Sequence, residues 1–383
     1  MLDLVRRLGL VLPPGAVLMH QGNPQLDWEG CVMWALLWSL PYAGLAESQL
    51  QNYNRKKGRQ WLDLARTSVN KAEARNPDAV PVRLVTGQLK ETLGSYDKAA
   101  EDYQRAIELD PKSGEAYRRL GYVYQLMNRP AEALATYRKA IEVEPSYYRP
   151  YLDLASFYVY QAQYREAETE YRKLLQLVPD LAAGHNSLGV ALMGMGRYAE
   201  AEAEYQIALR LRESSLYLNN LGANLAYMGR DAAAAQSYER GIEKGASTNL
   251  LYINLADSYR RLKRSADAEA TYQKGLQMAD SDLLQDPYNG FVRSLVAYAC
   301  ARLGDTRRAE MEIVQALKFS PNDSKALRFA VLTYETLNQR DKALEVLASA
   351  PADLLSELNR QPDLAGLRQD SRFAELLRSK SIH

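Results

Sequence analysis

A single alanine recurs along this chain of 383 residues at a nearly fixed interval. Successive copies are 34, 34, 34, 34, 33, 34, 41 and 34 residues apart. A period of this length is the sequence signature of an array of small units, each of which buries its apolar face against its neighbours. The repeat therefore predicts a stacked array rather than a domain with one central core. The alanines are Ala65, Ala99, Ala133, Ala167, Ala201, Ala234, Ala268, Ala309 and Ala343.

Each repeat predicts two antiparallel helices. A large side chain, most often a tyrosine such as Tyr103, follows the alanine by four residues, and a small or apolar residue comes three further on. These spacings mark one face of an α-helix. The first half of the block carries a Leu-Gly or Leu-Ala pair, such as Leu120-Gly121, whose small member lets the two helices approach closely. Residues such as Gly94 tolerate the left-handed backbone of a turn, and prolines such as Pro111 end the second helix.

On these residues, over about 45–351, the chain resembles the tetratricopeptide repeat family. The resemblance implies an all-α fold, a right-handed superhelical solenoid of tandem antiparallel helix pairs with about eight to nine repeats. One departure concerns the fourth position of the first helix, where Tyr117, Tyr151 and Tyr252 give way to His185 and Arg293 in other repeats. Arginine at this packing position puts the local register in question.

The ends differ from the array and predict three segments: an irregular N-terminus with a capping helix (1–41), the array (42–351) and C-terminal capping helices (352–383). Residues 31–40 are strongly apolar but fewer than the roughly 20 needed to span a bilayer. We expect a helix that ends at Pro41 and covers the first repeat; contact with a membrane surface is the alternative. Two blocks, from Ala46 to Ala65 and from Ala268 to Ala309, are seven residues longer than the norm, which favours lengthened helices.

Composition and the absence of known motifs argue against several classes of function. The net charge of +1 argues against a nucleic-acid scaffold, because non-specific binding to phosphates needs clustered positive charge. The two cysteines lie far apart, and Cys300 is expected to be a buried small hydrophobe, so a reducing, cytoplasmic location is predicted. The chain has no glycine-rich phosphate loop followed by lysine, no kinase motif and no histidine cluster. We therefore expect no enzyme, no cofactor and no metal site.

The family resemblance implies that the first helix of each repeat lines a concave groove that holds a protein or peptide partner. Among the residues in phase with that groove, Asn186, Asn220 and Asn254 resemble the asparagine ladders that hold an extended peptide, because an amide both donates and accepts hydrogen bonds. Alternatively, these asparagines satisfy neighbouring helix ends. The arginines beside them suit an acidic segment or a free C-terminus, unless they are merely solvated surface charge. The candidate groove residues are Arg118, Arg119, Tyr122, Asp153, Asn186, Asn219, Asn220, Asn254, Asp257 and Arg260.

Two functions remain open at this stage. The first is a non-catalytic scaffold that binds an extended peptide or a partner domain in the groove. The second is a detached regulatory or sensor half of a bacterial signalling enzyme or transcription regulator, acting with a separate catalytic chain. The second rests on segment 362–377, which resembles the tail of arrays fused to kinase, cyclase or winged-helix domains.

Overall fold

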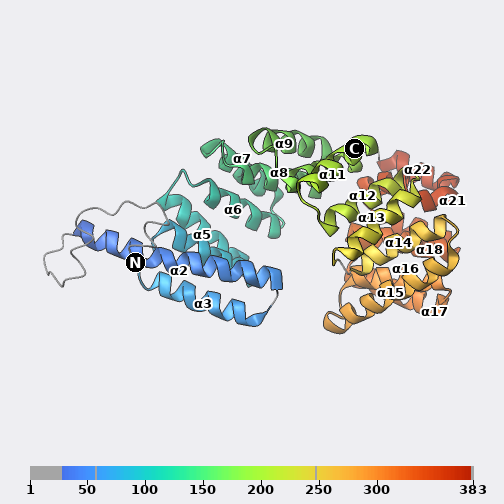
Figure 1. Ribbon diagram of the computed structural model, residues 1–383, viewed down its shortest axis with the longest axis horizontal. Helices are drawn as coiled ribbons and strands as arrows, with labels where there is room; N and C mark the ends of the chain where they lie inside the picture. Colours follow the sequence, from blue (N-terminus) through green and yellow to red (C-terminus); the bar gives the residue numbers. More distant parts are fainter. Residues whose placement is uncertain (1–27, 57, 246–247, 381–383) are drawn as a thin grey trace. The chain divides into compact units, whose positions relative to one another are not determined.

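The computed structural model describes residues 28–56, 58–245 and 248–380, and throughout these ranges the regular structure is helical (Figure 1). Helices follow one another as tandem pairs that pack side by side, as the 34-residue period predicted. The chain divides into two compact units, one ending at Phe157 and the other beginning at Tyr158. Each unit is described by itself below.

The first unit consists of three helix pairs and most of one further helix. Its helices are α2 (Trp28–Lys56), α3 (Arg59–Glu73), α4 (Val80–Thr92), α5 (Tyr96–Leu109), α6 (Gly114–Leu126), α7 (Pro130–Val143) and α8 (Tyr148–Tyr160), the last of which crosses the boundary between the units.

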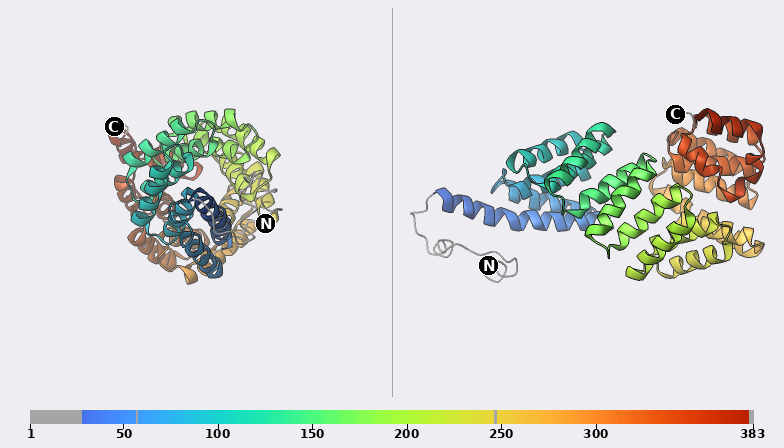
Figure 2. Two further views of the ribbon diagram at one scale, coloured as in Figure 1. Left: turned by 90° about the vertical axis from the view of Figure 1, so that its left-hand side faces the viewer. Right: turned by 90° about the horizontal axis from the view of Figure 1, so that it is seen from above.

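The second unit continues the pairs and ends in a tail of short helices (Figure 2). The pairs are built from α9 (Tyr164–Leu177), α10 (Ala182–Gly194), α11 (Tyr198–Leu211), α12 (Ser215–Tyr227), α13 (Asp231–Glu243), α14 (Asn249–Arg261), α15 (Ser265–Gln285), α16 (Gly290–Leu303), α17 (Thr306–Phe319), α18 (Ser324–Thr336) and α19 (Arg340–Ser349). The tail consists of α20 (Ala352–Leu358), the 3₁₀ turn η2 (Pro362–Leu364), α21 (Ala365–Arg368) and α22 (Ser371–Lys380).

The recurring alanine is buried in the second helix of every pair. Close approach of the two helices explains the small residue of the first helix as well. A Cβ atom on Gly222 of α12 would lie 2.6 Å from Cε1 of Tyr238, whose ring is buried in α13. Gly121 meets Tyr137 in the same way, with a corresponding distance of 3.0 Å. The predicted close approach of the two helices at the small residue is therefore confirmed.

The turns between paired helices use the left-handed backbone conformation that the sequence indicated. Gly94 and Gly304 have φ values of 74° and 86°, and Asn128 has a φ of 55°. Ala162 and Lys263 adopt the same conformation, at φ values of 56° and 59°. Nothing in their residue types predicts this, and the surrounding helix pair imposes it.

The prediction that the N-terminal helix ends at Pro41 is wrong, because α2 runs through this proline. A proline removes one backbone donor, but Ala43, Ala46 and Leu50 bury the following turns against α3 and α4 and stabilise the helix beyond it. The predicted irregular segment 1–26 lies outside the described residues, as does the side chain of Cys31. Among the described helices, none combines the length and the apolar character needed to cross a membrane.

The long block between Ala268 and Ala309 contains a lengthened helix, as expected. Helix α15 has 21 residues, whereas the preceding helices of this unit have 13 or 14. Leu284 near its end is 85% exposed, whereas Asp282 in the same turn accepts a hydrogen bond from Asn249 at the start of α14.

The tail differs from the expected pair of helices. The predicted second helix, 364–377, is divided at Gln369-Asp370 into α21 and α22. The Asp370 carboxylate accepts hydrogen bonds from the backbone N–H and the guanidinium of Arg372, which fixes the start of α22. Six apolar side chains of the tail are buried in the core of the second unit: Leu354, Leu355, Leu358, Leu364, Leu367 and Phe373.

Candidate functional site

In the first unit, the two candidate arginines are engaged by carboxylates of the same unit. Arg118 donates to Glu115 at 2.7 Å and to Asp153 at 2.5 Å, and Arg119 donates to Glu115 at 2.8 Å. Burial by itself would raise the pKa of Glu115, but the hydrogen bonds and charge of Arg118, with the charge of Arg119, lower it to about 2. The structure thus brings Arg118, Arg119 and Asp153 together, in a network that satisfies its own charges.

Tyr122 lies on the same helix, α6, and exposes more than a third of its surface. Of the candidates in the first unit it is the one whose side chain is open to a partner.

In the second unit, the asparagines of the first helices bond to one another. Nδ2 of Asn220 donates to Oδ1 of Asn186 at 3.0 Å, and Nδ2 of Asn254 donates to Oδ1 of Asn219 at 3.4 Å. These bonds link α10 to α12 and α12 to α14, so the amides join neighbouring repeats rather than helix ends. Within the described part of the chain, the side-chain oxygens of Asn220 and Asn254 accept no hydrogen bond.

Asp257, another candidate, is a buried acceptor. Its carboxylate accepts from the hydroxyls of Tyr272 and Tyr298, the latter at 2.8 Å, and Arg302 donates to Tyr298 at 3.0 Å. Asp257 therefore holds the first helices of two repeats together and, with 6% of its surface exposed, presents little to a ligand.

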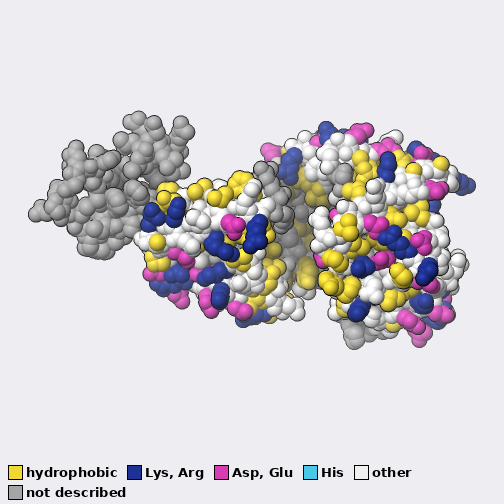
Figure 3. Space-filling model, turned by 90° about the horizontal axis from the view of Figure 1, so that it is seen from below, with side chains coloured by type: hydrophobic (Ala, Val, Ile, Leu, Met, Phe, Trp, Pro, Cys, Tyr) yellow, Lys and Arg dark blue, Asp and Glu magenta, His cyan; other side chains and the backbone are white. Residues whose placement is uncertain are grey.

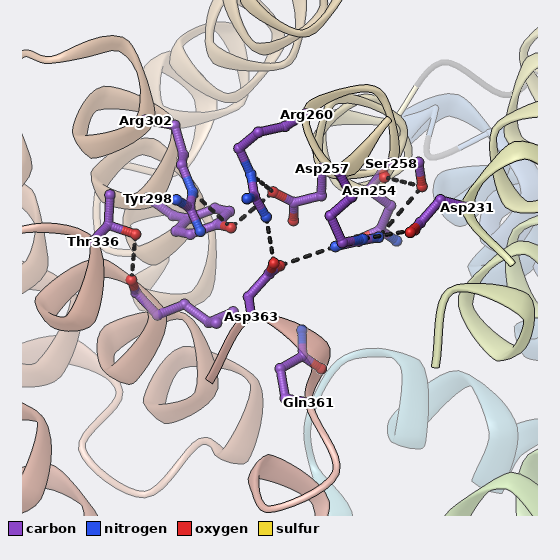
Figure 4. Close-up of polar contacts among 12 residues, drawn as sticks. Asp231, Asn254, Asp257, Ser258, Arg260, Tyr298, Arg302, Thr336, Gln361 and Asp363 are labelled. Atoms are coloured by element: carbon purple, nitrogen blue, oxygen red, sulfur yellow. Dashed lines mark hydrogen bonds and ion pairs between the residues drawn. The ribbon is translucent and has the colours of Figure 1, made fainter. Parts of the chain in front are cut away.

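Arg260 meets a carboxylate from the tail of the same chain (Figure 4). Asp363 accepts from Arg260 at 2.5 Å and from Arg261 at 2.9 Å, while Arg261 also donates to Asp231 at 2.6 Å. Burial would raise the pKa of Asp363, but the charges of Arg261 and Arg260 outweigh this effect and lower it. The side chain of Asp363 is 7% exposed, so this is a largely buried ion pair.

Two further tail residues contact the first helices. Glu357 accepts from the Tyr227 hydroxyl at 2.9 Å and from Arg328 at 2.7 Å, and Arg360 donates to the carbonyl of Gly194 at 2.9 Å. The tail therefore crosses the face made by α10, α12, α14 and α18, and Figure 4 shows Asp363 of the tail beside Arg260 of α14. We call this face of the second unit the tail-binding face.

Sequence reasoning missed Asp363, Glu357 and Arg328. The partner of Arg260 is 103 residues away in sequence, so no local spacing reveals it. One feature of the sequence could have indicated this contact: the adjacent arginines Arg260-Arg261, together with an acidic residue directly after Pro362.

The substitutions at the fourth position of the first helix keep the register. Nε of Arg293 donates to the carbonyl of Pro287 at 2.9 Å, as the Tyr151 hydroxyl does to Pro145 at 3.1 Å. In α10, the carbonyl of Pro179 accepts in the same way from the ring of His185, at 2.8 Å. Arg293 also pairs with Glu312 of α17. The register doubt at Arg293 is thereby resolved, because its side chain makes the contact of the residue it replaces.

Cys300 is a buried free thiol, as expected, and burial raises its pKa to about 11. No group of three metal-ligating side chains occurs in the part of the chain that the structure describes. Figure 3 shows positive and negative side chains intermingled over the face of each unit that is drawn.

Paired helices with a buried alanine and a glycine–tyrosine contact define a solenoid of helix–turn–helix repeats. The sequence matches family models described as "TPR repeat" over residues 92–128 and "Tetratricopeptide repeat" over residues 114–147, 152–215 and 219–282. The chain is a tetratricopeptide repeat protein. In general terms, this fold serves as a protein–protein interaction scaffold.

Three solved structures are similar to this chain. The structure of the APC/C hetero-tetramer Cut9–Hcn1 is 17% identical, with a TM-score of 0.53, over 84% of this chain and 58% of that chain. Pseudomonas aeruginosa PilF is 21% identical over 51% of this chain and 89% of its own, with a TM-score of 0.47. YrrB, described as a TPR protein with an unusual peptide-binding site, is 20% identical over 46% of this chain and 92% of its own, with a TM-score of 0.37.

At these identities the likeness concerns the fold alone. No curated protein matches the sequence. The resemblance of segment 362–377 to the tails of fused regulatory arrays stays a prediction.

Proposed function

We propose that this protein is a non-catalytic scaffold that holds a segment of a partner protein against the first helices of its second unit. The observation that carries the proposal is the position of the tail. A polypeptide segment of the chain itself lies across this face, anchored by polar side chains of α12, α14 and α18. A face that holds one segment in this way has the chemistry to hold another.

The asparagine row supports the same proposal. The side-chain oxygens of Asn220 and Asn254 remain free to accept backbone N–H groups, and both residues are only partly buried. An amide whose nitrogen is tied to its neighbour has a fixed orientation, so less side-chain freedom is lost when a ligand binds. Contacts to backbone groups would hold a peptide with little dependence on its sequence.

The test uses short peptides selected from a displayed random library on the full-length chain. We expect the selected peptides to bind the double variant Asn220→Ala/Asn254→Ala at least tenfold more weakly than the wild type. The thermal unfolding midpoint should fall, because Asn186 and Asn219 lose their hydrogen-bond donors, so circular dichroism must show that the double variant is folded at the assay temperature. Asn322→Ala, an exposed asparagine in the loop before α18, is the control and should bind as the wild type does. Equal affinity for the wild type and the double variant would contradict the proposal.

A further inference from the structure

We propose that the tail occupies the binding site of a partner protein. In the complex, an acidic, leucine-rich segment of that partner binds the tail-binding face in place of the tail. In the bound complex, two carboxylates of the partner take the positions of Glu357 and Asp363. This inference rests on the proposed function and names the chemistry of the ligand.

Two separate carboxylate sites belong to the array and not to the tail. Arg260 and Arg261 of α14 form one site, and Tyr227 of α12 with Arg328 of α18 forms the other. Both sites consist of array side chains, so they remain when the tail leaves. Arginine pairs with carboxylates through short, charge-assisted bonds, which gives these sites a preference for acidic residues.

The charge balance points to the same ligand. Without Asp363, the three guanidinium groups of Arg260, Arg261 and Arg302 face the two carboxylates of Asp231 and Asp257. An excess of positive charge at a partly buried site attracts acidic segments and disfavours basic ones.

The second site behaves similarly. Without Glu357, Arg328 keeps no carboxylate partner among the described residues. The Arg328 side chain is only partly buried, and its guanidinium forms short, charge-assisted hydrogen bonds with a carboxylate, so this site also prefers an acidic residue.

The surface around the two sites selects apolar residues. Leu354, Leu355, Leu358 and Leu364 of the tail are buried in the same cluster as Phe329 of α18. A ligand without apolar side chains here would leave this surface exposed. The preferred partner segment therefore carries leucines together with two carboxylates six residues apart, as Glu357 and Asp363 are.

The tail fills its own site imperfectly. Within the described residues, the buried Nε atoms of Arg260, Arg328 and the tail residue Arg360 have no hydrogen-bond partner. A buried donor left unpaired costs about 1 to 3 kcal/mol. The repeat pairs hold one another through contacts between neighbouring pairs, so the array can stay folded when the terminal tail opens. A ligand that accepts hydrogen bonds from the two array donors, Nε of Arg260 and Nε of Arg328, can therefore displace the tail.

The test measures the affinity of a fluorescein-labelled synthetic peptide, residues 352–368 of this sequence, for the full-length chain by fluorescence anisotropy. In the wild type the internal tail competes, so binding is weak. The variant Glu357→Gln/Asp363→Asn weakens the internal tail and should bind the peptide at least tenfold more tightly. The control Asp353→Asn/Glu375→Gln removes two tail charges with no ion pair among the described residues and should behave as the wild type does.

Two further measurements make the outcome decisive. A peptide with glutamine and asparagine in place of Glu357 and Asp363 should lose at least tenfold in affinity for the tail-weakened variant. This readout leaves the array unchanged, so it holds even if Arg260→Ala/Arg261→Ala fails to fold. When that double change is added to the tail-weakened variant and folding is verified by circular dichroism, binding should be lost.

Three results would overturn the inference: equal peptide affinity in the wild type and the tail-weakened variant, no binding to either, or wild-type dimers formed by exchange of tails. Dimers would identify the occupant as a second copy of the chain. If the inference fails while selected peptides still depend on Asn220 and Asn254, the proposed function stands and only the identity of its ligand falls.

Discussion

The close contact between glycine and tyrosine gives a test of the repeat packing in which two similar substitutions should act in opposite directions. Gly222→Ala adds a methyl group to α12, and Gly241→Ala adds one to α13 of the same helix pair. Alanine is favoured over glycine in a helix by about 1 kcal/mol, so both changes gain on propensity. The space around each glycine decides whether the substitution stabilises or destabilises the protein overall.

At Gly222 the new Cβ would lie 2.6 Å from Cε1 and 2.8 Å from Cδ1 of Tyr238, a ring that is 1% exposed and cannot move aside freely. Overpacking of a core costs about 1 to 3 kcal/mol. Two other repeats carry alanine at this place, Ala155 and Ala256, so a pair can widen to admit a methyl group. We therefore expect a net destabilisation of about 1 kcal/mol.

At Gly241 the nearest atom, on Leu251, would be 3.6 Å away, which is ordinary contact. We expect Gly241→Ala to stabilise the protein by about 0.5 to 1 kcal/mol. Urea denaturation of the full chain, followed by circular dichroism, should place the two variants on opposite sides of the wild type. Effects of equal sign and size would refute the argument that close helix approach selects the glycine.

Three further predictions follow from other contacts. Because Arg118 and its neighbours lower the pKa of Glu115 to about 2, the stabilisation is complete above pH 4.5 and is lost as the pH falls toward 2. By linkage, this stabilisation amounts to about 3 kcal/mol. Acid unfolding of Glu115→Gln, followed by circular dichroism, should therefore lack this pH-dependent loss of stability. An acid unfolding curve identical to that of the wild type would contradict the prediction. Arg293→Ala should lower the free energy of unfolding by about 3 kcal/mol, because it leaves the largely buried Glu312 without its cation. A decrease of less than about 1 kcal/mol, measured by urea denaturation, would contradict this prediction. Lys263→Gly should raise the free energy of unfolding by about 1 kcal/mol, because glycine adopts a φ of 59° without strain. Any decrease in the free energy of unfolding would contradict this reasoning.

The fold was predictable because its determinants are local and repeated. The alanine, the small residue of the first helix and the turn residues recur in phase, so one correct interpretation extends to all repeats. The prediction at Pro41 was wrong because the determinant there is a tertiary contact. A proline usually ends a helix, but here the packing of the following turns against two other helices outweighs one lost hydrogen bond.

The site was only partly predictable, because its partners are distant in sequence. The phase of the repeat correctly placed Asn220, Asn254 and Arg260 on first helices of the second unit. It could not reveal that Asp363 lies against Arg260, since this contact depends on how the tail folds back over α14. In the same way, Asp257 reads as a groove residue from its position, yet two tyrosine hydroxyls from neighbouring helices bury it.

The most direct test of the central claim is hydrogen exchange of the tail amides, residues 352–368, in the full-length protein, measured by mass spectrometry. If the tail-binding face holds this segment, its helical amides should be protected in the wild type. In Arg260→Ala/Arg261→Ala they should exchange at least tenfold faster, while the amides of α18 keep their protection. Tail amides that exchange at the rate of an unstructured peptide in the wild type, or that are unaffected by the loss of both arginines, would contradict the account.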